Sequence, residues 1–170
     1  PSSTEIVCKL GFRENLVGVS HECDYPLSVK DLPILTKPRF SPIESSQKID
    51  NSVQDLLKKG LSVYEVNTDL LKNLAPDLII TQAQCEACAV SLNDVKKAVS
   101  DWVGNKPDIV SLEPNYLDEV WSDFERVGEK LNSSDSYLKF KSEIEQRLEN
   151  LKQKSQLLIK RPSVVCVEWI

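Results

Sequence analysis

The sequence lacks several features that would assign a function directly. Its 21 basic residues are outnumbered by 26 acidic residues, the net charge is -5, and no basic stripe is present. Nucleic acid is therefore excluded as the main partner, because binding it requires the neutralisation of phosphate charge. No apolar run approaches the length of a membrane-spanning helix, and no secretory signal is visible. The chain does not begin with methionine, which predicts a processed or trimmed N-terminus.

Cysteine and histidine are also scarce. Five cysteines are too few for a disulfide scaffold, and a chain of 170 residues is long enough for one domain with its own core. The number of cysteines therefore does not indicate whether the protein lies in an oxidising or a reducing compartment. His21 is the single histidine, and no set of residues has the pattern of a Ser-His-Asp triad or a glycosidase carboxylate pair. We predict that the protein is not an enzyme.

The stretch Pro76–Ser91 predicts a unit of strand, loop and helix. Asp77–Thr81 is a short apolar run behind a proline, which is typical of a buried strand. The polar loop that follows carries Cys85-x-x-Cys88, and helical signals resume at Ser91. Ligands of parallel α/β sheets bind outside the carboxyl ends of the strands, which is where this loop lies.

The rest of the chain predicts further units of this kind. A strand would normally precede a helix at the start of an α/β domain, and none precedes the first predicted helix. Short or buried strands are predicted at Leu16–Ser20, Pro33–Thr36, Val63–Val66 and Asp108–Leu112. Helices are predicted from Pro1 to a stop at Gly11, over Ser46–Lys59, from the cap Asn67 to Pro76, over Ser91–Trp102 and over Leu117–Leu131. The fold class is therefore α/β, with a parallel, Rossmann-like sheet and helices on both faces.

A long helix is predicted for residues 134–161, where apolar residues recur at spacings near 3.6. A helix of about 25 residues measures on the order of 35–40 Å, which is long enough to bridge two lobes. Ser163–Val167 then predicts a new β-branched strand, which would be an exposed edge without more chain beyond it. We expect an N-terminal lobe at 1–133, a connecting helix at 134–161 and the start of a truncated second lobe at 162–170. The exposed strand would favour a homodimer.

Five segments carry a resemblance to a known family: Pro1–Val7, Gly18–Pro26, Ala75–Gln82, Gln84–Ser91 and Val167–Ile170. They resemble the substrate-binding proteins of ABC importers for vitamin B12 and iron chelates, most closely the branch labelled cobalamin-binding. The resemblance implies ligand capture without chemistry, in a cleft between two α/β lobes. The implied ligand is a corrinoid or a related metal chelate. The implied location is periplasmic or at the cell surface, with docking on the permease of the importer.

The candidate ligand-binding residues lie in the loops after the predicted strands and at the start of the first helix. Aromatic faces in these loops suit a flat macrocycle, although ordinary core packing explains such residues equally well. The set comprises Ser3, His21, Cys23, Tyr25, Gln82, Cys85, Tyr116 and Trp169. No cofactor is required, and a bound cobalamin or metal ion would be the ligand itself.

The thiols leave two alternatives open. His21, Cys23, Cys85 and Cys88 lie on loops that a parallel sheet would place at one edge, and a His-Cys₃ set suits zinc or another soft metal. The chain would then be a cytoplasmic metal-binding protein. A CxxC motif between a strand and a helix is also the thioredoxin arrangement, in which Cys85 would be the nucleophile of a thiol–disulfide oxidoreductase. The simpler interpretations of Cys85 and Cys88 are a structural disulfide or two small buried side chains.

Overall fold

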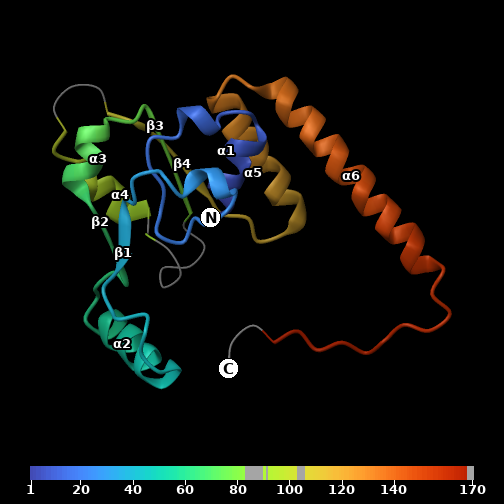
Figure 1. Ribbon diagram of the computed structural model, residues 1–170, viewed down its shortest axis with the longest axis horizontal. Helices are drawn as coiled ribbons and strands as arrows, with labels where there is room; N and C mark the ends of the chain where they lie inside the picture. The colour runs from blue at the N-terminus through green and yellow to red at the C-terminus, as the bar shows by residue number, and fades with distance from the viewer. Residues whose placement is uncertain (83–89, 91, 103–105, 168–170) are drawn as a thin grey trace.

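The computed structural model describes residues 1–82, 90, 92–102 and 106–167 (Figure 1). Its helices are α1 (Ser2–Lys9), α2 (Ser46–Lys58), α3 (Thr68–Leu74), α4 (Leu92–Ala98), α5 (Leu117–Lys130) and α6 (Ser134–Gln156). Its strands are β1 (Thr36–Pro38), β2 (Tyr64–Val66), β3 (Leu78–Gln82) and β4 (Asp108–Leu112). None of the helices in these ranges is long and apolar enough to cross a membrane.

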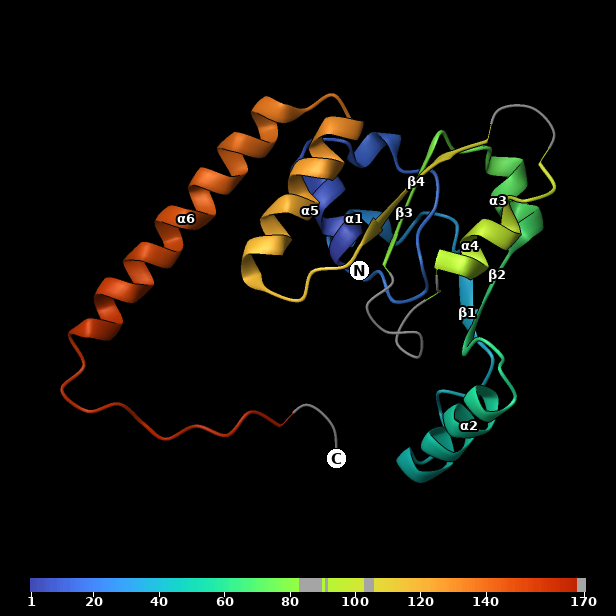
Figure 2. The same cartoon turned by 180° about the vertical axis from the view of Figure 1, so that it is seen from behind.

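The parallel pair β3–β4 forms the centre of the fold. Its register pairs Leu78 with Asp108 and Gln82 with Leu112, so both strands end at the same edge. α1 and α5 lie on one side of this pair, and α3 and α4 lie on the other (Figures 1 and 2). β1 and β2 form a separate antiparallel pair. The predicted α/β class, with a parallel sheet and helices on both faces, is confirmed.

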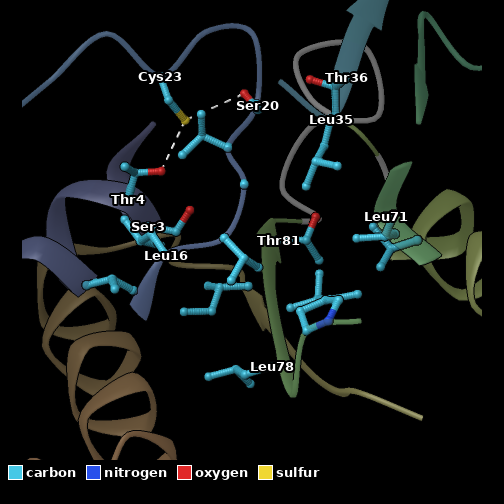
Figure 3. Close-up of a pocket in the computed structure, with 18 of the residues that line it drawn as sticks. Ser3, Thr4, Leu16, Ser20, Cys23, Leu35, Thr36, Leu71, Leu78 and Thr81 are labelled. Atoms are coloured by element: carbon cyan, nitrogen blue, oxygen red, sulfur yellow. Dashed lines mark hydrogen bonds between the residues drawn. The ribbon is translucent and has the colours of Figure 1, made fainter. Parts of the chain in front are cut away.

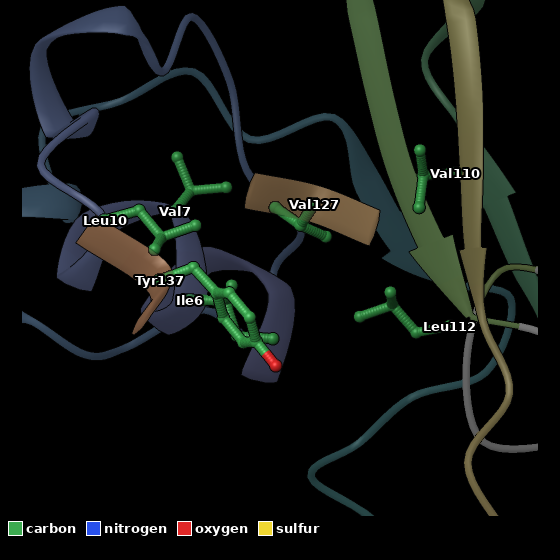
Figure 4. Packing of buried hydrophobic residues seen from close by; sticks show 7 residues of the cluster. All are labelled: Ile6, Val7, Leu10, Val110, Leu112, Val127 and Tyr137. Atoms are coloured by element: carbon green, nitrogen blue, oxygen red, sulfur yellow. The ribbon is translucent and has the colours of Figure 1, made fainter. Parts of the chain in front are cut away.

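A cluster of buried apolar side chains joins α1 to β4, α5 and α6 (Figure 4). Its members are Ile6, Val7, Leu10, Val110, Leu112, Val127 and Tyr137. Gly128 lets α6 approach α5, because a Cβ atom at this position would lie only 3.1 Å from the Cβ atom of Tyr137. The rings of Phe124 and Phe140 stack with their centroids 5.6 Å apart. These contacts fix the first turns of α6 against α5.

Helix ends follow the predicted signals in most places. The side chain of Asn67 caps α3 by accepting a hydrogen bond from the N–H of Leu70 at 3.1 Å. Gly11 and Gly60 follow α1 and α2 with φ of 94° and 65°, a conformation that glycine adopts without steric cost. Ser2 and Glu5 have the spacing of a capping box, which predicts Ser2 as the N-cap of α1. This prediction is wrong, because Ser2 lies inside α1 and Pro1 is the N-cap, with no side-chain cap hydrogen bond.

The strand predicted at Leu16–Ser20 is reduced to a single parallel bridge between Val19 and Ile34. The N–H of Val19 donates to the Pro33 carbonyl at 3.0 Å, and the N–H of Leu35 donates to the Val19 carbonyl at 2.8 Å. No second strand pairs with the other edge of this segment among the described residues. One-sided pairing therefore leaves the segment extended without making it a regular strand.

The strand predicted at Ser163–Val167 is also wrong, because none of these residues is in a strand. Val165 is 85% exposed, and the segment runs away from the end of α6 without packing on the lobe (Figure 1). A β-branched run needs a neighbouring strand edge to form a ladder, and no described strand lies beside this segment (Figure 1).

α6 is the long helix predicted for residues 134–161, but it ends at Gln156, five residues before the predicted limit. Only Tyr137 in this helix is buried, and Leu151 on the predicted apolar stripe is 61% exposed. The helix therefore extends beyond the lobe that its first turns contact (Figure 2). The division at residues 133 and 161 and the homodimer remain predictions.

Replacing Val127 by alanine should destabilise the chain by about 2 kcal/mol, because it removes two methyl groups from a fully buried site and leaves a cavity. Val165→Ala is the matched control and should change stability by less than about 0.5 kcal/mol, since this side chain is exposed. Urea unfolding followed by circular dichroism measures both. Equal effects of the two substitutions would contradict the assigned core.

Candidate functional site

The described residues line a pocket of about 530 Å³ between two walls. The segment Leu16–Cys23 and α1 form one wall, and β3 forms the other (Figure 3). The polar part of the lining includes Thr4, Ser20, His21, Cys23, Thr36 and Gln82. The apolar part includes Val7, Phe12, Leu16, Leu35, Leu71 and Leu78.

The polar groups gather at one end of the pocket, which we call the polar end. β3 ends at Gln82 and the opposite wall ends at Ser20–Cys23, so both contribute their carboxyl ends here. α1 begins at the same end, where Ser3 and Thr4 lie close to Ser20 and Cys23 (Figure 3). This edge is where ligands of parallel α/β sheets bind.

The imidazole of His21 is fixed by Thr36 and Tyr64. The hydroxyl Oγ1 of Thr36 accepts a hydrogen bond from the backbone N–H of His21 at 3.1 Å and lies 2.7 Å from Nδ1. The ring of Tyr64 lies 5.2 Å from the imidazole, centroid to centroid. The other nitrogen, Nε2, is buried and has no hydrogen-bond partner among the described residues. The Oε1 atom of Glu22 lies 3.4 Å from Nε2, without the geometry of a hydrogen bond.

The thiol of Cys23 lies in an environment that favours the thiolate. Burial raises the pKa of Cys23, but the Thr4 hydroxyl, the positive amino terminus and Ser20 outweigh burial, so the net pKa is lowered. The Sγ atom of Cys23 lies 3.1 Å from Oγ1 of Thr4 and 3.7 Å from Oγ of Ser20. In α1, by contrast, burial raises the pKa of Cys8, and the positive charge of Arg13 does not compensate for it.

The phenol of Tyr64 stays neutral beside this histidine. Burial raises the pKa of Tyr64, and the negative charge of Glu22 raises it further. The Tyr64 ring therefore presents an uncharged aromatic surface to His21 at all pH values near neutrality.

The pocket brings together four of the predicted ligand-binding residues, namely Ser3, His21, Cys23 and Gln82. Tyr25 and Tyr116 do not line it, and they are 54% and 75% exposed. The remaining predictions, Cys85, Cys88 and Trp169, lie outside the described residues. Whether any of these side chains contacts a ligand remains a prediction.

Four residues of the pocket were not predicted from the sequence, namely Thr4, Ser20, Thr36 and Tyr64. Thr4 is next to the predicted residue Ser3 in the sequence, and Ser20 is next to the predicted residue His21. These neighbouring positions could have identified both residues. Thr36 and Tyr64 come from strands β1 and β2, which no local pattern connects to His21.

The predicted His-Cys₃ metal site and the predicted redox thiols both depend on Cys85 or Cys88, so both remain predictions. Within the described residues, no group of three or more histidine, cysteine, aspartate or glutamate side chains has a geometry that could hold a metal ion.

Comparison with known proteins gives one match. The family model described as periplasmic binding protein matches residues 1–169, which is nearly the whole chain. No curated protein and no solved structure matches the chain.

Cys23 should alkylate at lower pH than Cys8, because only the thiolate reacts and the two pKa values are shifted in opposite directions. Thr4→Val keeps the shape of the side chain and removes the hydroxyl, so it should move the Cys23 profile to higher pH. Peptide mapping by mass spectrometry after iodoacetamide pulses at several pH values reports each thiol separately.

Thr36→Val serves as the control for this measurement, since Thr36 contacts His21 and makes no hydrogen bond to the thiol of Cys23. Its Cys23 profile should match that of the unmodified chain. If Thr4→Val does not change the pH dependence of Cys23 alkylation, the Thr4 hydroxyl does not lower the pKa of Cys23.

Proposed function

Because the chain belongs to the periplasmic binding protein family, we propose that it is the solute-binding component of an ABC importer for a corrinoid or a related metal chelate. Proteins of this family generally bind solutes without converting them, and the family supports a periplasmic location. We propose further that the captured solute contacts the polar end of the pocket and is then passed to the permease of the importer.

The unpartnered Nε2 atom of His21 is the observation that carries this proposal. A buried polar atom without a hydrogen bond costs about 1–3 kcal/mol, and such atoms are few in folded proteins. Nε2 is buried at the edge where a ligand of this fold class binds, and Thr36 holds the other nitrogen. A ligand that contacts Nε2 would remove the cost of leaving this atom unpaired.

The contact with Thr36 is compatible with two roles for His21. Where Nδ1–H donates to Thr36, the Nε2 lone pair is free to coordinate the metal of a chelate, an arrangement common among metal-binding histidines. Where the Thr36 hydroxyl donates to Nδ1, Nε2 carries the proton and donates to a ligand oxygen. The carboxylate of Glu22 at 3.4 Å from Nε2 favours the second role, and this mostly exposed side chain is able to turn away.

The size of the pocket constrains how a corrinoid would bind. Pockets of about 300–1,000 Å³ enclose drug-sized ligands, and a corrinoid is considerably larger than these. A cavity of about 530 Å³ therefore admits only part of such a ligand. The rest of the macrocycle would lie outside the mouth of the cavity. We therefore expect this chain alone to bind a corrinoid weakly.

Aquocobalamin should bind the chain weakly, and His21→Asn should reduce the affinity by about 5- to 150-fold, as expected for the loss of about 1–3 kcal/mol. Asparagine has a polar atom in place of Nδ1, so it keeps the contact with Thr36 while it removes Nε2. Isothermal titration calorimetry measures the affinity, and visible absorption reports any exchange of the axial water for imidazole.

Two comparisons separate the roles of His21. Cyanocobalamin has cyanide at the exchangeable axial position, so its affinity should equal that of aquocobalamin if Nε2 only donates a hydrogen bond. His21→Gln, which has a donor near the position of Nε2, should then restore much of the affinity. If His21→Asn binds every cobalamin as well as the unmodified chain does, His21 is not part of the ligand site.

A further inference from the structure

The chain between β1 and β2 projects from the lobe as a separate unit. Residues 41–61, which contain α2 and which we call the helical arm, include no buried residue. α2 stands apart from the other helices in both views (Figures 1 and 2). Local hydrogen bonds complete its C-terminal end, from the N–H of Gly60 to the Leu57 carbonyl at 2.9 Å and from the N–H of Leu61 to the Leu56 carbonyl at 3.0 Å. The helical arm is therefore formed by local interactions and adds no residue to the core.

One face of α2 is apolar and remains accessible. The residues on this face follow the spacing i, i+4, i+7, i+8 of an amphipathic helix, and they are Ile49, Val53, Leu56 and Leu57. Leu57 is 43% exposed, and the other three are only half-buried. A helix of 13 residues is marginally stable in water unless its apolar face packs on something. The described residues leave this face partly uncovered, so a further contact there would stabilise the helix.

The base of the helical arm is joined to the polar end of the pocket. The N–H of Arg39 donates to the Val63 carbonyl at 2.9 Å, which extends the pairing of β1 with β2 to the point where the arm begins. The ring of Phe40 lies 6.5 Å from that of Tyr64, centroid to centroid. The ring of Tyr64 lies 5.2 Å from the imidazole of His21. A continuous row of rings therefore leads from the base of the arm to the unpartnered Nε2 atom.

The helical arm also stands on the side of the lobe where the pocket has its polar end. β3 runs toward the side from which α2 projects, and its last residue, Gln82, lines the polar end (Figures 1 and 2). A solute that extends out of the pocket at this end would emerge on the same side as the arm.

We propose that the apolar face of α2 binds the part of the solute that lies outside the cavity. This inference depends on the proposed function, because a solute that fits into about 530 Å³ would not reach the arm. The faces of a corrinoid macrocycle are largely apolar, and covering them with Val53 and Leu57 would remove apolar surface of both partners from water. The continuity of the arm with the rings beside His21 favours the solute over a second copy of the chain as the occupant.

The double substitution Val53→Ser with Leu57→Ser tests the proposal, because it makes the apolar face polar. Gln47→Ser with Asn51→Ser is the matched control, since these two exposed residues lie away from the apolar face and the introduced residue is the same. The probes are aquocobalamin and an aquocobaloxime, a planar cobalt chelate that is small enough to enter the cavity. Both have an exchangeable axial water, so they differ mainly in size. Isothermal titration calorimetry measures the affinities, and circular dichroism checks the helix content of both variants.

The apolar-face variant should bind aquocobalamin about tenfold more weakly than the control variant, and the two variants should bind the cobaloxime equally. Equal aquocobalamin affinities would overturn the proposal, and so would an equal loss for both probes, since this loss would mean that α2 supports the pocket without touching the solute. Sedimentation that changes from dimer to monomer only in the apolar-face variant, with aquocobalamin binding intact, would assign the face to a second copy.

The outcome also separates this proposal from the proposed function. Binding of aquocobalamin that depends on His21 but not on Val53 and Leu57 would overturn the role of the helical arm alone. Failure of the unmodified chain to bind aquocobalamin at all would overturn both proposals.

Discussion

The parallel pairing of β3 with β4 is the interaction on which the rest of the structure depends. It places the carboxyl ends of both strands at one edge, and Gln82 is the last residue of β3 there. The inner face of β4 anchors α1 through the cluster that includes Val110 and Val127. α1 in turn places the Thr4 hydroxyl against Cys23. The polar end of the pocket is therefore positioned by the core, although most of its functional groups lie outside the core.

The two parts of the pocket have different physical requirements. At the polar end, individual groups are held by specific hydrogen bonds, as Thr36 holds His21 and Thr4 holds Cys23. Along the rest of the pocket, the lining is apolar and includes Val7, Leu16 and Leu78, so binding there would depend on the burial of apolar surface.

Local sequence patterns predicted those parts of the fold that depend on local interactions. The apolar run Asp108–Leu112 matches β4, and the cap at Asn67 and the glycine after α1 end their helices as expected. The strands predicted at Leu16–Ser20 and Ser163–Val167 did not form as regular strands, because a ladder requires a partner edge that the propensity of the segment cannot supply.

The same distinction applies to the candidate site. His21, Cys23 and Gln82 were predictable because each follows an expected strand, and the edge where parallel strands end is a general binding position. Thr36 and Tyr64 were not predictable, since they reach His21 from β1 and β2 by tertiary packing. Tyr25 and Tyr116 follow extended segments as well, yet their side chains turn outward. The position of a residue after a strand therefore predicts that it lies at the edge where the strands end. It does not predict whether the side chain points into the pocket.

Binding of solute at the polar end of the pocket can be tested by mapping amide chemical shifts during a titration with cyanocobalamin. The expected result is that the largest shift changes occur at Ser20–Cys23, Thr36 and Gln82, while the exposed half of α6 and residues 163–167 stay unchanged. Largest changes in α6, or in the apolar lining around Leu78 with none at His21, would contradict the claim.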